Sequence, residues 1–190
     1  MNKSIEKGRI IIVSQNDYIH YEMDKRKQPL LGVVIHNDAS ELNANEWREV
    51  LIDAPEERYV QGIAHYYIDR NQQWQAIDTE RIAWHTANSI GNEQYLGYEV
   101  LESLSSTDEE FLLNEQETLR TIASDMIDYN LTPNRDTVRL HLEFSETECP
   151  HRSLEIHTNW KTTLDGMPDE WIINEMKDYF IEQIKQYILN

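Results

Sequence analysis

Apolar and polar residues along the chain follow two periods, one typical of β-strands and the other of helices. Two apolar runs, GRIIIVS at residues 8–14 and LLGVVIH at residues 30–36, predict strands. The second run is apolar on both faces, which is typical of a central strand. Residues 64–70 (AHYYIDR) and 74–77 (WQAI) predict a pair of strands with RNQQ as the turn between them, and residues 95–102 (YLGYEVLE) predict another strand.

Residues 138–144 (VRLHLEF) alternate between apolar and polar side chains. In a strand this pattern places His141 on the face opposite the apolar one, because successive side chains point to opposite faces. The apolar face consists of Val138, Leu140, Leu142 and Phe144. We therefore expect a strand over these residues that directs His141 away from the main apolar layer.

Three other segments have the period of an amphipathic helix. The first begins at residues 43–46 (NANE) and the second at residues 107–110 (TDEE), both with a capping-box pattern, and the second is expected to end near residue 130. The third covers about residues 169–189, with an apolar stripe formed by Ile172, Ile173, Met176, Phe180, Ile184 and Ile188. Strands mixed with helices predict an α/β domain with a mixed central β-sheet flanked by helices, and a length of 190 residues suits a single domain over residues 1–190.

The composition restricts the classes of function. With 17 Lys and Arg against 35 Asp and Glu, the formal net charge is −18, which argues against nucleic-acid binding and against unaided attraction to an anionic membrane or cell wall. No run approaches the roughly 20 apolar residues of a membrane-spanning helix, and the apolar part of the N-terminal sequence MNKSIEKGRIIIVSQ is short for a signal peptide. We therefore expect no nucleic-acid partner, no membrane insertion and no signal peptide.

Three residues indicate a metal centre. Cys149 is the only cysteine and follows His141 by eight positions, while His36 ends the apolar run at residues 30–36. Thiolate and imidazole are natural ligands of Zn²⁺, and a site with three protein ligands keeps a fourth position for water, as catalytic zinc sites do. A lone histidine is more often a packed structural residue, but the combination predicts a zinc hydrolase.

Four segments resemble successive blocks of the zinc-dependent N-acetylmuramoyl-L-alanine amidases: GVVIHNDAS, AHYYIDRNQQWQAI, RIAWHTANSIGNEQYLGYEV and RLHLEFSETECPHRS. These enzymes have the type 2 amidase fold, which is shared with peptidoglycan recognition proteins and found in many phage endolysins. The resemblance covers roughly residues 30–152. It implies that the chain is a catalytic domain with the type 2 amidase fold. It also implies that the zinc ligands are His36, His141 and Cys149.

The same resemblance implies two catalytic residues. Glu99, in GYEV, is where many members place a glutamate that takes a proton from water and later protonates the departing amine; the alternative is an exposed strand glutamate. Thr147, two residues before Cys149, is where the family carries lysine or threonine. Its hydroxyl would donate a hydrogen bond to the carbonyl oxygen as that oxygen gains charge, and the alternative is a loop threonine bonded to its own backbone.

Contacts with the substrate are also implied. His85, in AWHTAN, resembles a histidine that lines the substrate groove beside the metal, and Asn37 and Asn88 are candidates for contact with a muropeptide. His65 is expected either to reach the site from its strand or to be structural.

The chain departs from the family pattern at one position, since some members have a catalytic tyrosine where this sequence has Ala64. That role is absent here unless Tyr66 or Tyr67 takes it. The chemistry is therefore expected to depend more strongly on Glu99.

The expected reaction is hydrolysis of the amide bond between N-acetylmuramic acid and L-alanine in bacterial peptidoglycan, with Zn²⁺ as the cofactor. The alternatives are a non-catalytic peptidoglycan recognition module, in which the cysteine ligand is often missing, and a cytosolic amidase that recycles muropeptides. As an endolysin-type domain, the chain is expected to be monomeric and to leave the host cytoplasm through a holin-type membrane hole. It is also expected to act with a cell-wall-binding domain outside these residues.

Overall fold

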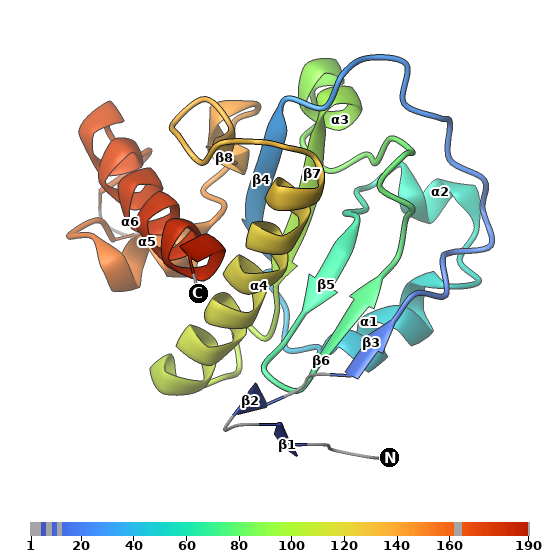
Figure 1. The fold of residues 1–190 in the computed structure, drawn as a ribbon, viewed down its shortest axis with the longest axis horizontal. Helices are drawn as coiled ribbons and strands as arrows, with labels where there is room; N and C mark the ends of the chain where they lie inside the picture. Colours follow the sequence, from blue (N-terminus) through green and yellow to red (C-terminus); the bar gives the residue numbers. More distant parts are fainter. Residues whose placement is uncertain (1–4, 7–8, 11–12, 162–164, 190) are drawn as a thin grey trace.

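The computed structural model describes residues 5–6, 9–10, 13–161 and 165–189, and its centre is a mixed sheet with strand order β3-β6-β5-β7-β4-β8 (Figure 1). β5 and β6 are antiparallel, whereas the other neighbouring strands in this sheet are parallel. The strands are β3 (Val13–Gln15), β4 (Gly32–Asn37), β5 (Tyr66–Ile68), β6 (Gln72–Gln75), β7 (Tyr95–Val100) and β8 (Val138–Leu140). A separate antiparallel pair consists of β1 (Ile5–Glu6) and β2 (Arg9–Ile10).

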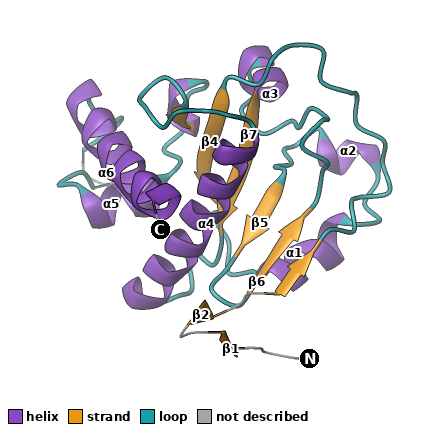
Figure 2. Cartoon of the chain, in the orientation of Figure 1, coloured by secondary structure: helices purple, strands orange, loops and turns teal. Residues whose placement is uncertain are grey.

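Helices cover both faces of the sheet (Figure 2). α4 contacts β7 and α6 contacts β8 on one face, whereas α1 packs against β5 and β6 on the other. The helices are α1 (Ala44–Leu51), α2 (Glu56–Tyr59), α3 (Ser89–Gln94), α4 (Asp108–Asp128), α5 (His151–His157) and α6 (Glu170–Leu189), and a 3₁₀ turn spans His141–Glu143. The predicted α/β architecture is confirmed.

Strand alternation divides the core into two layers. On β4, Val33 and Ile35 face the cluster that contains α4 and α6, so His36 points to the opposite face. On β7, Tyr98 faces the same cluster, so Glu99 points to the same side as His36, its register partner in the neighbouring strand. The second layer, between that side and α1, includes Leu51, Tyr59, Tyr67 and Trp74.

The predicted helix starts are confirmed. Asn43 caps α1 and Thr107 caps α4, and in each case a glutamate three residues later completes the capping box. α2, α3 and α5 were not predicted, because helices of four to seven residues are too short to show a helical period. No helix in the described part of the chain has the length and apolar content needed to cross a membrane. The apolar stripe of α6 joins the core as predicted, with Ile172, Met176, Phe180 and Ile184 buried and Ile173 and Ile188 partly buried.

The strand predicted over residues 138–144 is wrong in its second half. β8 ends at Leu140, and the chain continues as a 3₁₀ turn. The carboxylate of Glu143 accepts a hydrogen bond from the backbone N–H of Leu140 at 2.7 Å and pairs with Lys177 at 2.8 Å. A side chain thus satisfies a backbone group that a longer strand would pair with its neighbour.

Other strand boundaries also differ from prediction: β5 covers residues 66–68 rather than 64–70, β6 covers 72–75 rather than 74–77, and β7 covers 95–100 rather than 95–102. The turn predicted at RNQQ is shorter, because Oδ1 of Asp69 accepts hydrogen bonds from the N–H groups of Asn71 and Gln72 at 2.7 and 3.0 Å. β6 therefore begins at Gln72. The strand predicted over residues 8–14 corresponds to β2 and β3, and its residues 8, 11 and 12 lie outside the described residues.

Candidate metal centre

The predicted metal ligands lie where the carboxyl ends of parallel strands meet. His36 is next to last in β4, and His141, 105 positions later, follows the last residue of β8. Cys149 comes from the loop between the 3₁₀ turn and α5. Because parallel strands of an α/β sheet end at one edge, residues distant in sequence converge there.

The three donor atoms have separations that suit one zinc ion. Nδ1 of His36 lies 3.1 Å from Nδ1 of His141 and 3.8 Å from Sγ of Cys149, and all three donors lie within 4.8 Å of one another. Tetrahedral coordination, with zinc–nitrogen bonds of about 2.05 Å and zinc–sulfur bonds of about 2.3 Å, separates the donors by about 3.3–3.6 Å. The donor set and its spacing therefore fit zinc.

Burial favours the metal-binding form of both histidines. Desolvation lowers the pKa of His141 to about 4, and desolvation together with the neighbouring imidazoles holds the pKa of His36 well below its ordinary value. Both rings are therefore neutral at pH 7. Burial raises the pKa of the Cys149 thiol, and a bound cation would oppose that shift by favouring the thiolate.

Glu99 has the environment of an acid–base group. It is the register partner of His36 and lines the same pocket. Burial, with a smaller contribution from Asp38, raises the pKa of its carboxyl group to about 8. Its Oε2 is buried without a hydrogen-bond partner among the described residues. A buried polar atom without a partner costs free energy, so this environment is typical of a functional carboxyl group rather than of an exposed strand glutamate.

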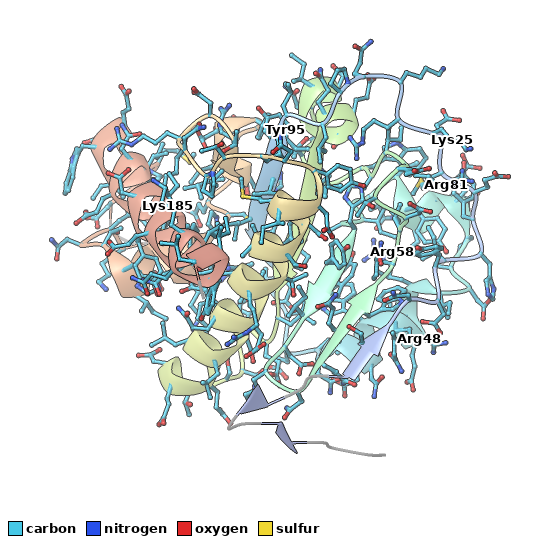
Figure 3. All side chains as sticks on the ribbon, viewed as in Figure 1. Lys25, Arg48, Arg58, Arg81, Tyr95 and Lys185 are labelled. Carbon is cyan, nitrogen blue, oxygen red and sulfur yellow. The ribbon has the colours of Figure 1, made fainter. Side chains whose placement is uncertain are left out.

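These side chains line a pocket of about 710 Å³. Part of its wall comes from α1, with Trp47, and from α2, with Arg58, which Figure 3 labels. Another part comes from the segment around α3, with Asn88 and Asn92. Within the described residues, Arg58 is the one lysine or arginine in the lining. The pocket is large enough for an extended ligand that reaches well beyond the metal donors.

Residues 26–152 match the N-acetylmuramoyl-L-alanine amidase family. The chain belongs to this family. It is 46% identical over 188 residues to endolysin LysK of Staphylococcus phage K and 40% identical over 183 residues to endolysin PlyTW of Staphylococcus phage Twort. Each alignment covers 96% of this chain but 38% of the relative, so the chain spans less than half the length of these curated relatives.

The fold of this amidase-family chain is similar to that of a solved structure, the catalytic domain of PlyG. The TM-score is 0.68 at 21% sequence identity, and the match covers 94% of this chain and 96% of the PlyG chain. At this identity the similarity concerns the fold, and it confirms the predicted type 2 amidase architecture.

Thr147 lies in the lining of the pocket, as the resemblance to the amidases implies. Its Oγ1 accepts a hydrogen bond from the backbone N–H of Cys149 at 3.3 Å, which is the local backbone bond given above as the alternative. Accepting this bond uses one lone pair of the hydroxyl group, so the O–H of Thr147 can still donate to a ligand.

Asn37 is 4% exposed and belongs to the lining of the pocket, and its amide group bonds to the protein. Nδ2 donates to the carbonyl oxygen of His36 and to Oγ of Ser153, while Oδ1 accepts from the N–H groups of Arg152 and Ser153. These bonds use the full capacity of the amide. These bonds give Asn37 a structural role, in which it joins the end of β4 to the start of α5, just after Cys149, and its contact with a muropeptide stays a prediction.

His85 and His65 lie behind the metal centre. His85 borders the pocket but is 6% exposed, and burial lowers its pKa to about 3. Its Nδ1 lies 2.9 Å from Nε2 of His36, and its Nε2 lies 3.3 Å from the carbonyl oxygen of Tyr95. His65 is fully buried, and its Nδ1 accepts the backbone N–H of Gly97 at 3.0 Å. Both expected substrate contacts thus have their ring nitrogens directed at protein atoms.

The two tyrosines considered in place of the family tyrosine face opposite sides of the sheet. Tyr67 lines the pocket, and its hydroxyl oxygen accepts the N–H of Ala64 at 3.2 Å. Burial raises the pKa of Tyr67, so its hydroxyl stays protonated. Tyr66 lies on the other face, stacked on Tyr98.

Two residues of the site were missed by the sequence analysis. Asp38 contributes to the raised pKa of Glu99 and accepts a hydrogen bond from Nε1 of Trp47 at 3.0 Å. Oγ of Ser145 lies 3.1 Å from Nε2 of His141. Asp38 directly follows the IHN block, so its position in the sequence was a usable signal. Ser145 gave no such signal, because its contact depends on the 3₁₀ turn.

Proposed function

We propose that this chain is a zinc-dependent amidase domain that hydrolyses the amide bond between the lactyl group of N-acetylmuramic acid and L-alanine in peptidoglycan. One observation carries the proposal: three zinc-type donors converge beside the buried, unpartnered carboxyl oxygen of Glu99 in one pocket of the described residues. A module that only recognised peptidoglycan would need no acid–base group at this place. Family membership supports the choice of bond, and the donor set supports the choice of metal.

His36, His141 and Cys149 would hold the zinc ion. When bound, zinc supplies Lewis-acid chemistry, polarising a carbonyl group and lowering the pKa of water. The spacing of the three donor atoms and the lowered pKa of both imidazoles support this role.

Glu99 moves the proton. As a carboxylate it accepts a proton from the attacking water, and as an acid it then gives a proton to the nitrogen of the departing L-alanine. Its pKa of about 8 makes both forms accessible near neutral pH, and a cation in the adjacent site would lower that pKa. The hydroxyl group of Thr147 donates a hydrogen bond to the substrate carbonyl oxygen as that oxygen gains negative charge.

Elemental analysis tests the metal. The purified protein should carry about one zinc ion per chain, as expected for one three-ligand site, and His36→Ala should lose it. Stoichiometric zinc in a variant with His36, His141 and Cys149 all replaced would refute this site.

Digestion of purified Gram-positive peptidoglycan tests the bond. The products should be stem peptides with free L-alanine amino groups, without new reducing sugar ends. New reducing ends in place of free amino groups would contradict the proposal. A parallel digestion of soluble muropeptides separates a wall hydrolase from a recycling amidase, since the latter would prefer the soluble substrate.

The relatives suggest where the domain works. Because it is similar to part of two endolysins of staphylococcal phages, we place it as a single, monomeric catalytic module of a phage lysin. Such a lysin reaches the wall from the host cytoplasm through a holin-type membrane hole. With a net charge of −18, the module gains no electrostatic attraction to an anionic wall, so a separate wall-binding domain would supply targeting. Fusing such a domain should raise the lytic rate at low enzyme concentration, and an unchanged rate would contradict this view.

A further inference from the structure

We infer that His85, seated against Gly97, is the positioning residue that fixes the tautomer and ring orientation of His36 for metal binding. The inference rests on the proposed zinc site and adds a second layer of residues behind it. It gives His85 a role through His36 in place of the direct substrate contact expected from the resemblance.

A run of hydrogen bonds leads from the backbone of β7 to His36. Nε2 of His85 lies 3.3 Å from the carbonyl oxygen of Tyr95. Tyr95 is the first residue of β7 and is labelled in Figure 3. A carbonyl oxygen can only accept, so Nε2 of His85 carries the hydrogen and Nδ1 of this neutral ring is left as an acceptor. Nε2 of His36, which lies 2.9 Å from that Nδ1, must then donate. His36 is thereby held with the lone pair of its Nδ1 directed toward His141 and Cys149, as a metal ligand requires.

Gly97 makes room for the ring of His85. A Cβ atom at residue 97 would lie 2.6 Å from Nδ1, 2.7 Å from Cγ and 3.0 Å from Cε1 of His85, so any side chain there would push the ring away. The backbone of Gly97 is itself held by His65, whose Nδ1 accepts the N–H of Gly97 and whose backbone N–H donates to the Gly97 carbonyl, both at 3.0 Å. The position of His85 is thus fixed in two independent ways, by the hydrogen bonds of its ring and by the absence of a side chain at Gly97. The bonds to Gly97 also give buried His65 a supporting role.

Two substitutions of His85 form a matched pair. Leucine and asparagine have nearly the same shape, but only asparagine keeps an acceptor close to the position of Nδ1. We expect His85→Leu to weaken zinc binding by about 10–100-fold, as loss of a partner behind a ligand commonly does, and His85→Asn to stay within about threefold of the wild type. Zinc affinity is measured by competition with a chelator, and thermal unfolding of the metal-free variants shows whether both fold alike. Equal affinities for the two variants would overturn the inference.

Gly97→Ala perturbs the ring without removing it. In the wild-type background we expect it to weaken zinc binding by about 10–100-fold. In a His85→Ala background the same change should cost less than about twofold, because both substitutions act through one ring and their effects do not add. Additive losses would show that Gly97 acts by another route and would contradict the inference.

Nuclear magnetic resonance of the metal-free wild type gives a readout independent of zinc. A hydrogen bond between the rings should transmit a ¹⁵N–¹⁵N coupling from Nε2 of His36 to Nδ1 of His85, and its absence would overturn the inference. The failures are distinguishable. A wild type that binds no zinc refutes the proposed function, whereas a wild type that binds zinc with an affinity that His85→Leu leaves unchanged refutes the positioning role alone.

Discussion

The two histidine ligands are held by different kinds of structure. His36 lies in a strand paired on both sides, is 2% exposed, and has its second ring nitrogen against buried His85. His141 follows edge strand β8 in a 3₁₀ turn, is partly exposed, and has its second ring nitrogen against Ser145 in the next loop. The sheet half of the site consists of His36 and Glu99, and the loop half consists of His141, Thr147 and Cys149.

A buried polar network holds the loop half where no strand ladder does. Asn37 donates to Oγ of Ser153, which in turn donates to Oε2 of Glu115 at 2.7 Å, and Nε2 of His157 lies 2.7 Å from the other oxygen of Glu115. Glu115 is fully buried on α4, so α4 and α5 meet at one carboxylate. The backbone register therefore fixes the sheet half, whereas side-chain hydrogen bonds fix the loop half, and the two halves should respond differently to substitution.

The largest effect is expected in the sheet half, at Glu99. Glu99→Gln keeps the shape of the side chain but removes its proton transfer, so turnover should fall by about 10²–10⁴-fold. Zinc content should not change, because the ligands do not depend on this carboxylate. Turnover and zinc content are measured on the same preparation, and near-wild-type turnover would remove Glu99 from the mechanism.

A smaller kinetic effect is expected in the loop half, at Thr147. Thr147→Val removes the hydroxyl group and should lower kcat by roughly 10²-fold with little change in KM, because a bond to the developing oxyanion forms only in the transition state. Thr147→Ser keeps the hydroxyl group and should restore most of the rate. A Thr147→Val enzyme with unchanged kcat/KM would leave Thr147 only its bond to the backbone of Cys149.

Asn37 tests the dependence of the loop half on side-chain bonds. Asn37→Ala leaves buried polar groups unsatisfied, so it should lower the free energy of unfolding by about 1–3 kcal/mol and weaken zinc binding. Asn43→Ala is the control, since the side chain of Asn43 also accepts a hydrogen bond from a backbone N–H group, but at the start of α1. It should cost about 1 kcal/mol or less and leave zinc affinity unchanged. Equal zinc affinities in both variants would show that the network does not position Cys149.

The raised pKa of Glu99 predicts a pH dependence for the sheet half. Between its ordinary value of 4.5 and about 8, the folded metal-free protein holds a proton that the unfolded chain releases. The bound proton stabilises the folded protein fully below pH 4.5, and this stabilisation is lost as the pH rises to about 8. Wild-type stability should therefore fall relative to Glu99→Gln across this window, by at most about 1.4 kcal/mol per pH unit. Denaturant unfolding of the two metal-free proteins at several pH values measures the difference, and parallel curves would contradict the pKa assignment.

The sequence predicted the sheet half better than the loop half, for a physical reason. The apolar run that ends at His36 and the β-rich run around Glu99 show their strands directly, because burial requires a regular apolar pattern. In the loop half, the alternation over residues 138–144 predicted a strand that Glu143 ends early by bonding the N–H of Leu140. A contact of this kind depends on side-chain geometry and leaves no periodic signal.

Asn37 and His85 show the same limit for the site. Both were expected to contact the substrate, and both lie next to metal ligands. The resemblance to the amidases did not show that the amide group of Asn37 is fully bonded within the protein, or that the ring of His85 rests against Gly97. Such roles depend on the register of neighbouring strands and on the loop after Cys149, neither of which can be read from spacing along the chain.

The smallest effect is expected from the partner of the second histidine, Ser145. Ser145→Ala should weaken zinc binding by less than about threefold, because His141 and Ser145 are both partly exposed and a water molecule can replace the lost hydroxyl group. His85 is buried and no water can take its place, so His85→Leu should cost at least several times more in the same chelator competition. If Ser145→Ala and His85→Leu weakened zinc binding equally, the contrast between a sheet-held and a loop-held ligand would have no energetic consequence.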